Sequence, residues 1–151
     1  MSGNNVIILK NNVPAIRGAI TGEGLKKAVT AGAIVIEANA KINVLRTFSS
    51  KMFGALANSI QIYISKATRT EAEAEIGPTV IYGRIQELGG IITAIRAKML
   101  SWVSDTGERI FAHLVQIPAR PYLRPAVDEH IEDIEAAVSV QLRKDIEKAA
   151  Q

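Results

Sequence analysis

The sequence predicts an α+β fold, in which an antiparallel sheet of about four strands packs with two long helices, one in the N-terminal half and one at the C-terminus. Two patterns support this prediction. Apolar residues recur at helical spacing in residues 25–45 and 127–146. Between these segments, residues 60–64 and 99–117 carry the alternating or β-branched apolar runs that are typical of strands.

The length of 151 residues favours a single domain that spans residues 1–151, and a hydrophobic fraction of 48% is enough for a core. The net charge of +3 is weak, and it does not favour nucleic-acid binding. The chain has no cysteine, which excludes disulfides, thiolate metal ligands and a cysteine nucleophile. The apolar run at residues 6–9 is too short for an export signal or a membrane span. Polar residues within 28–45 indicate a helix among protein elements rather than in lipid, so we expect no membrane partner.

The N-terminal half is predicted to contain an arm, a long helix and a weaker element. Residues 6–20 read as a strand or a loose segment broken by proline and glycine, which makes residues 1–20 a candidate extended arm. Thr21 is expected to cap the helix that follows, which runs to about Leu45. Residues 47–58 are a weaker helix or a turn region.

The middle of the chain is predicted to be built of strands. Residues 60–65 alternate as a half-buried strand, and the glutamates of residues 71–75 would share one solvated strand face. Residues 80–88 continue the alternation until Gly89 and Gly90, which favour a positive-φ turn or a close backbone approach. Residues 99–103 and 109–117 are expected to pair as a hairpin around the turn at 104–108.

Residues 117–126 form a stiff segment, because prolines 118, 121 and 125 disfavour helix and central strand there. Pro125 suits the first position of a C-terminal amphipathic helix that runs to Ala149. Arg120 and Arg124 lie on this segment. We expect them to form salt bridges with carboxylates or to anchor the segment, because a guanidinium matches a carboxylate in two places.

No catalytic constellation is visible in the sequence. The acidic residues around His130 are expected to be a solvated first helical turn, with an acidic contact face or a metal site as alternatives. His113 reads as a structural histidine, and Asp105-Thr106-Gly107 reads as a turn. We therefore expect no enzymatic activity, no metal and no cofactor, and the chain reads as an assembly subunit.

Three motifs resemble a known family. Residues 82–90, Tyr-Gly-Arg-Ile-Gln-Glu-Leu-Gly-Gly, are similar to the tyrosine-small-x-aliphatic-x-glutamate-aliphatic-glycine signature of tailed-phage tail-completion and virion-morphogenesis proteins. Residues 120–126 match its arginine-proline-aromatic-leucine-x-proline-alanine signature, and residues 54–60 match its glycine-x-leucine-x-x-serine-isoleucine element. The order of elements is the same from about Gly24 to the C-terminus. Some members have glycine-threonine after the glutamate. The glycine-glycine pair here is closer to the Mu-like morphogenesis branch.

This resemblance implies a virion structural protein of the head–tail junction, a tail-completion or tail-terminator subunit that caps the tail tube and joins it to the head connector. Related terminators form hexameric rings. The implied partners are further copies of the chain, the tail tube protein and head-closure or connector proteins, and the implied location is the virion neck after assembly in the host cytoplasm. The candidate subunit-interface or structural residues are Glu87, Gly89, Gly90, Arg120, Pro121, Tyr122 and Arg124.

Other functions remain open at this point. A head-closure or adaptor protein of the same neck would share the setting but occupy another layer. A small nucleic-acid-binding regulator would use the two arginines on phosphates and would show a steep salt dependence. A hydrolase is the least favoured alternative.

Overall fold

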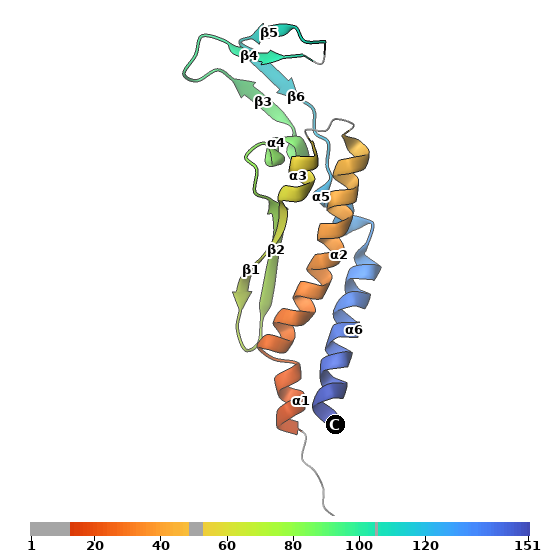
Figure 1. Ribbon diagram of the computed structural model, residues 1–151. Coiled ribbons are helices and arrows are strands. Elements are labelled where there is room, and N and C mark those ends of the chain that lie inside the picture. The colour runs from red at the N-terminus through yellow and green to blue at the C-terminus, as the bar shows by residue number, and fades with distance from the viewer. Residues whose placement is uncertain (1–12, 49–52, 105) are drawn as a thin grey trace, which may run out of the picture. The chain divides into compact units, whose positions relative to one another are not determined.

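The computed structural model describes residues 13–48, 53–104 and 106–151 (Figure 1). Within these ranges the chain forms helices and short strands in a mixed order. The elements are α1 (Val13–Ala19), α2 (Glu23–Thr47), α3 (Phe53–Ser59), β1 (Ile60–Ala67), β2 (Ala72–Pro78), α4 (Gly83–Leu88), β3 (Gly90–Thr93), β4 (Leu100–Val103), β5 (Arg109–Ala112), β6 (Leu114–Ile117), α5 (Leu123–Asp128) and α6 (Ile131–Ala150).

The α+β class and the two long helices, α2 and α6, are confirmed. The strands, however, do not join into one sheet of about four. In the described ranges they form three two-stranded sheets, with the pairs β1–β2, β3–β6 and β4–β5. The chain divides into two compact units. One holds α1, α2 as far as Ile36, residues 62–76 and α6, and the other holds residues 37–61 and 77–129. The prediction of a single domain stays a prediction.

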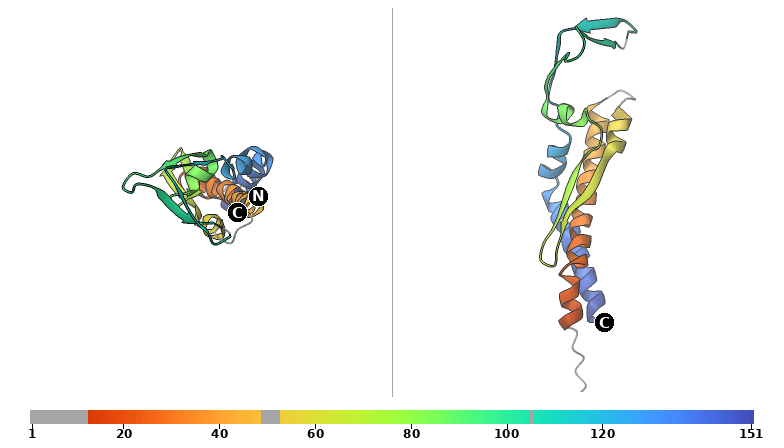
Figure 2. Two further views of the ribbon diagram at one scale, coloured as in Figure 1. Left: turned by 90° about the horizontal axis from the view of Figure 1, so that it is seen from above. Right: turned by 90° about the vertical axis from the view of Figure 1, so that its left-hand side faces the viewer.

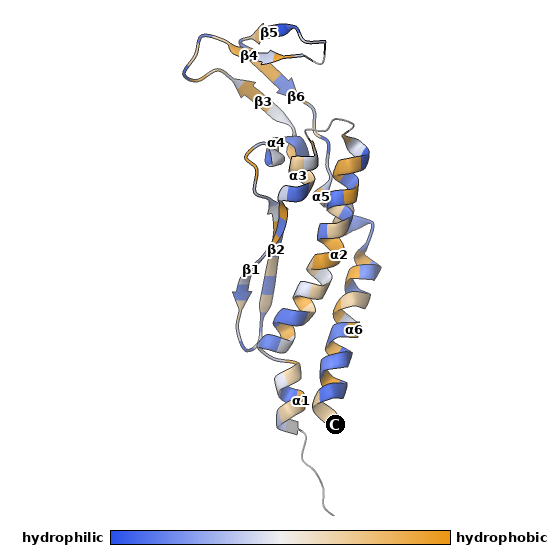
Figure 3. Ribbon diagram, viewed as in Figure 1, coloured by the Kyte–Doolittle hydropathy of each residue, from blue (hydrophilic) through white to orange (hydrophobic). Residues whose placement is uncertain are grey.

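In the first unit, α2 carries a row of small residues and approaches α6 at one of them, Gly32. Gly24, Ala28 and Gly32 follow each other at intervals of one helical turn, and all three are buried. A Cβ atom added to Gly32 would lie 2.9 Å from Val138 Cγ2 and 3.2 Å from Ile134 Cγ2 on α6. Because glycine has no side chain, the two helices can approach each other closely at Gly32. Figure 3 shows the apolar residues of α6 alternating with polar ones along its length.

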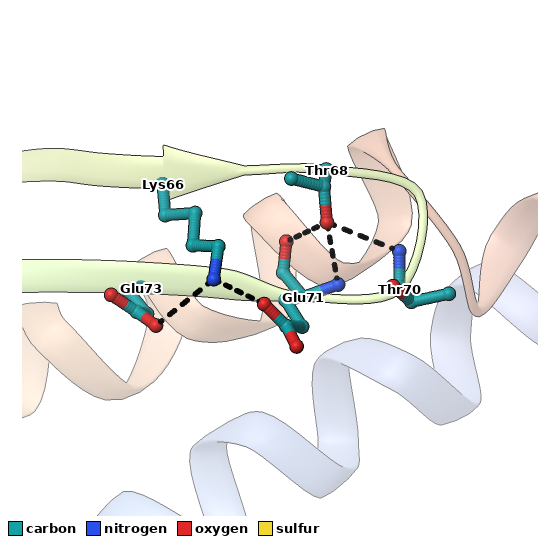
Figure 4. A network of polar contacts seen from close by, with 5 residues as sticks. All are labelled: Lys66, Thr68, Thr70, Glu71 and Glu73. Atoms are coloured by element: carbon teal, nitrogen blue, oxygen red, sulfur yellow. Dashed lines mark hydrogen bonds and ion pairs between the residues drawn. The ribbon is translucent and has the colours of Figure 1, made fainter.

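The β1–β2 hairpin turns through residues 68–71 and is held by polar contacts (Figure 4). The hydroxyl of Thr68 donates to the carbonyl of Glu71 and accepts from the backbone N–H groups of Glu71 and Thr70. Lys66 forms ion pairs with Glu71 and Glu73 beside the turn. The glutamates of this hairpin are exposed, which confirms the solvated face predicted for residues 71–75.

Helix α1 replaces part of the predicted arm. Residues 13–19 are helical rather than extended, and residues 1–12 lie outside the described ranges. Proline is tolerated because Pro14 occupies the first turn, where its missing N–H is not needed. Thr21 does not cap α2 with its side chain, since its hydroxyl donates back to the carbonyl of Arg17 at 2.8 Å. The bend instead uses Gly22, whose φ is +54°.

In the second unit, residues 83–88 are helical, whereas the alternating pattern of residues 80–88 predicted a strand. Ile81, Ile85 and Leu88 are spaced four and three residues apart, so the same apolar run also fits a helical period. The N–H of Gln86 bonds to the carbonyl of Tyr82 at 3.2 Å, which closes a helical turn. Short apolar runs do not distinguish the two structures by periodicity alone.

The predicted β4–β5 hairpin is confirmed, with Trp102 opposite Ile110. The returning segment 109–117 is not one strand. It divides at His113 into β5, which pairs with β4, and β6, which pairs with β3. Figure 2 also shows the two pairs as separate sheets.

The C-terminal helix is also divided, and α5 ends before α6 begins at Ile131. His130 leaves the helical conformation, with φ −128° and ψ 24°. Pro125 is the third residue of α5 rather than the first of one long helix. Neither proline nor glycine marks the division, but Glu132 and Asp133 in the first turn of α6 are the acidic residues that a helix start favours.

Candidate functional site

The three motifs singled out in the sequence meet in the second unit, and Glu87 is the residue that joins two of them. Its carboxylate, on α4, accepts hydrogen bonds from three successive backbone N–H groups at the start of α5. Oε2 lies 2.6 Å from Tyr122 N and 2.9 Å from Leu123 N, and Oε1 lies 3.0 Å from Arg124 N. These N–H groups have no partner inside their own helix, so the carboxylate supplies the cap that α5 lacks locally. We call Glu87, Gly83, Gly89, Tyr122 and Asn43 the α4–α5 junction.

Tyr122 is the most deeply buried large side chain of this junction. Its hydroxyl donates to the carbonyl of Gly83 at 3.1 Å, and its own carbonyl accepts from the amide of Asn43 on α2, also at 3.1 Å. Burial and, to a lesser degree, the negative charge of Glu87 raise the pKa of Tyr122 to about 12, from an ordinary value of 10.0. The phenol therefore stays protonated and holds α4 against the segment that precedes α5.

Two glycines make this close packing possible. A Cβ on Gly83 would lie 2.4 Å from Pro78 Cγ and 3.2 Å from Leu56 Cδ1, which belongs to the third motif at residues 54–60. A Cβ on Gly89 would lie 2.7 Å from the backbone nitrogen of Ala119. Gly89 also has φ +68°, which confirms both the positive-φ turn and the close approach predicted there.

The stiff segment 118–122 is attached by its backbone and by Arg120. The N–H of Arg120 donates to the carbonyl of Gln86 at 2.8 Å. Its guanidinium lies 5.6 Å from the ring centroid of Phe48, which stacks on Phe53. Arg120 thus anchors the segment on an aromatic face, in agreement with the second of the two predicted roles.

The remaining candidate residues have smaller roles inside the chain. Arg124 pairs with Asp128 one turn further along α5, at 3.4 Å, so its predicted salt bridge is confirmed. Both side chains are largely exposed, and the pair contributes little stability. Gly90 opens β3 opposite Ile117, and Pro121 is exposed beside Tyr122. The assignment of these residues to a subunit interface stays a prediction.

Two residues were not singled out in the sequence: Asn43, which belongs to the junction, and Phe48, which contacts Arg120 beside it. Asn43 was visible as a polar residue in an apolar helix, and an amide that is partly buried in such a place requires a partner. No sequence pattern indicated a role for Phe48. Its contact with Arg120 joins residues that are far apart in the chain, and its stacking on Phe53 follows no helical or strand period. The polar groups of the junction bond to one another, so the arrangement fixes backbone geometry.

The two sheets of residues 90–117 present apolar side chains without a core of their own. From residue 84 to residue 121, no described residue is buried. The register places matching apolar residues on one face of each sheet. On β4–β5 these are Leu100, Ala112, Trp102 and Ile110, and on β3–β6 they are Ile92, Val115 and Ile117.

The other faces of these sheets are also partly apolar. Phe111 and Val103 are 57% and 59% exposed on β4–β5, and Ile91 and Leu114 are 61% and 51% exposed on β3–β6. A two-stranded sheet is marginally stable by itself in water, because it needs further strands or a packed surface. Exposed apolar residues gathered in one segment indicate an interaction surface.

The histidines and the acidic residues form no metal site in the described part of the chain. His113 Nδ1 lies 3.1 Å from the carbonyl of Lys98, to which it donates, and so ties the β3–β4 loop to the start of β6. The acidic residues around His130 were predicted to form one solvated first helical turn, but only Glu132 and Asp133 lie in the first turn of α6, and Glu129 lies outside it. His130 Nδ1 is buried without a hydrogen-bond partner in the described chain.

Among the described residues one helix, α2, is long and apolar enough to cross a membrane by length and composition. The helix also carries polar groups that are engaged within the protein. Asn43 bonds to Tyr122, and Glu37 pairs with Lys41 at 2.7 Å. The expectation that the chain has no membrane partner stays a prediction.

Comparison of the chain with protein-family models, with curated proteins and with solved structures finds no match.

Proposed function

We propose that this chain is a structural subunit of the virion head–tail junction, a tail-completion or tail-terminator protein that caps the tail tube and joins it to the head connector. The motif resemblance at residues 54–60, 82–90 and 120–126 supports this proposal. The contacts of the junction add support, because all three motifs contribute residues to one packed site through Leu56, Gly83, Glu87 and Tyr122.

The observation that carries the proposal is the apolar surface of residues 90–117. Its two small sheets expose Phe111, Val103, Ile91 and Leu114, and residues 84–121 contain no buried residue in the described chain. A protein whose strands cannot bury their own side chains gains stability when other subunits cover them. Assembly into a larger particle is the function that such a surface serves best.

Purified protein provides the direct test. We expect a ring-shaped oligomer in negative-stain images and in analytical ultracentrifugation, either alone or after addition of tail tubes. Tubes incubated with the protein should carry it at one end and stop growing. A monomer that neither oligomerises nor binds tube ends would contradict the proposal.

The two competing functions predict different outcomes. A head-closure or adaptor protein would bind purified connectors rather than tube ends, and immunogold labelling of particles would place it in another layer of the neck. A nucleic-acid-binding regulator would shift DNA at low salt and lose the complex steeply as salt is raised. A tail terminator should show no such DNA shift.

Arg120 provides a test of the junction in the particle. Arg120→Ala removes the contact with Phe48, and Arg124→Ala removes only an exposed ion pair. In a complementation assay we expect Arg120→Ala to lower the yield of tailed, infectious particles. Arg124→Ala is the matched control, and it reduces the yield only if Arg124 contacts a neighbouring subunit.

A further inference from the structure

The loop between β3 and β4 carries an unusual combination of exposed groups. Ile95 is 93% exposed, and it lies next to Arg96 and close to Lys98, which are exposed as well. In the described chain neither cation has a carboxylate partner. The loop is tied in place, because the carbonyl of Lys98 accepts a hydrogen bond from His113. An apolar side chain beside two cations on a tied loop is therefore available to a partner that offers apolar and acidic groups together.

The chain itself carries such a complement at the start of α6. Ile131 is 51% exposed. It lies on the same row of α6 as Ile134 and Val138, three and seven residues further on, and the exposed Glu132 and Glu135 lie beside it, on the side away from Ile134. No ion pair involves either glutamate within the described residues. The side of α6 that carries Ile134 and Val138 is occupied by Gly32 of α2. The exposed part of Ile131, with Glu132 and Glu135 beside it, is accordingly available to a second molecule, and we call these residues the Ile131–Glu135 side of α6.

We propose that the β3–β4 loop of one copy docks on the Ile131–Glu135 side of α6 of a second copy, with Ile95 against Ile131 and with Arg96 and Lys98 facing Glu132 and Glu135. The inference rests on the proposed function, because it names the partner of the surface described there. The two surfaces differ, so the contact is heterologous, and each subunit offers one of them to each neighbour. Repetition of such a contact produces a ring when the rotation closes.

A second copy fits better than another partner for two reasons. The complementary charges are both present on this chain, so one copy can offer the cations and the next copy the carboxylates of the same contact. A phosphate ligand would need only the cations, whereas the exposed Ile95 beside them also fits the apolar side chain of Ile131 on a second copy. Binding of phosphate or DNA by the loop is an outcome that the test below detects.

Charge reversal tests the contact. Arg96→Glu with Lys98→Glu makes both surfaces acidic, and Glu132→Lys with Glu135→Lys makes both surfaces basic. We expect each double variant to raise the protein concentration at half-assembly by about 30-fold or more, because like charges then face each other at every contact. The matched control is Arg46→Glu with Arg69→Glu, which reverses two exposed cations elsewhere and should assemble as the unmodified chain does.

Two rescue experiments make the test specific. A chain that carries all four reversals should assemble again, since the charges are exchanged rather than lost. An equimolar mixture of the two double variants should also assemble, because alternating acidic and basic subunits satisfy every contact. Circular dichroism and thermal melting of each variant establish that it is folded before assembly is measured.

The outcomes separate the inference from the proposed function. If the unmodified chain assembles and caps tubes but the reversals assemble equally well, the contact is wrong and the function stands. If the reversals fail and neither rescue works, the contact is wrong as well. If the unmodified chain remains monomeric with and without tubes, both the proposed function and the proposed contact between copies are contradicted. Loss of a DNA or phosphate complex in Arg96→Glu with Lys98→Glu, with assembly intact, would assign the loop to phosphate instead.

Discussion

Glu87 Oε2 lies 2.6 Å from the backbone nitrogen of Tyr122, 35 residues further along the chain. The same carboxylate bonds to the next two N–H groups, so one side chain of α4 satisfies the exposed donors of α5. Tyr122 returns the contact through its hydroxyl, which donates to Gly83 at the other end of α4. The two residues thus fix one short helix against another in both directions.

Removing the charge of Glu87 should weaken the second unit. Glu87→Gln keeps one acceptor oxygen but loses the ionised group that bonds three N–H groups, and we expect a loss of roughly 2 kcal/mol in the free energy of unfolding. Chemical denaturation measures it. Glu75→Gln, at an exposed carboxylate of β2, should change stability by less than about 0.5 kcal/mol. Equal effects of the two substitutions would contradict the capping role.

The stability of the protein should fall at alkaline pH because of Tyr122. Its pKa is about 12 in the folded chain against 10.0 ordinarily, so the folded state prefers the neutral phenol. That preference contributes fully below pH 10 and is lost as the pH rises from 10.0 to about 12, in total roughly 2–3 kcal/mol. Denaturation at a series of pH values measures the decline.

Two phenylalanine substitutions isolate this effect. Tyr122→Phe should be less stable by roughly 1–2 kcal/mol at pH 8, because the carbonyl of Gly83 loses its donor, and its decline above pH 10 should be reduced. Tyr63→Phe, at an exposed position on β1, should keep the decline of the unmodified chain. A Tyr122→Phe variant with an unchanged alkaline decline would assign that decline to other groups.

Gly89 should not tolerate a side chain. Gly89→Ala introduces a Cβ at 2.7 Å from Ala119 N, and it also forces alanine to φ +68°, so we expect a loss of at least about 1–2 kcal/mol. Gly54→Ala is the matched control, because nothing lies within 4 Å of its Cβ position in α3. Thermal unfolding should show Gly54→Ala at or above the stability of the unmodified chain.

Replacement by alanine should affect stability differently at Gly32 than at Gly18, which is also in a helix. In a free helix, alanine in place of glycine stabilises by up to about 1 kcal/mol, and Gly18→Ala in α1 should approach this gain since its Cβ meets nothing within 4 Å. Gly32→Ala places a Cβ 2.9 Å from Val138 Cγ2, so the gain should be cancelled or reversed. The double variant Gly32→Ala with Val138→Ala should recover part of the loss. Equal gains at both glycines would show that α2 and α6 do not approach at Gly32.

The features that follow from local patterns were predictable from the sequence. Residues 127–146 showed the apolar period of α5 and α6, and the turn chemistry of residues 104–108 indicated the β4–β5 hairpin, in which the N–H of Gly107 bonds to the carbonyl of Ser104. The glycine pair at Gly89 predicted a close approach that the distance to Ala119 confirms. Each of these signals acts within a few residues, where periodicity and φ preferences are informative.

The features that depend on distant partners were not predictable. Residues 80–88 fit a strand and a helix equally by pattern, and the helix is selected by Tyr122 and Glu87 contacts that no local signal reports. The division of segment 109–117 follows from two different pairing partners, β4 and β3. Glu87 and Tyr122 were both singled out as motif residues, but their mutual hydrogen bond could not be inferred from a separation of 35 residues.

The α4–α5 junction also closes the chain on itself at the base of a long excursion. Gly90 is paired with Ile117, and Gln86 is bonded to Arg120, so the stretch between them leaves and returns at one place. Its ends are held together by groups that lie outside it. The segment between β3 and β6 could therefore change in sequence, take up insertions or be replaced. In each case α4 and α5 would keep their hydrogen bonds to each other. Such an excursion can diversify to match a new binding partner while the scaffold that carries it keeps its structure.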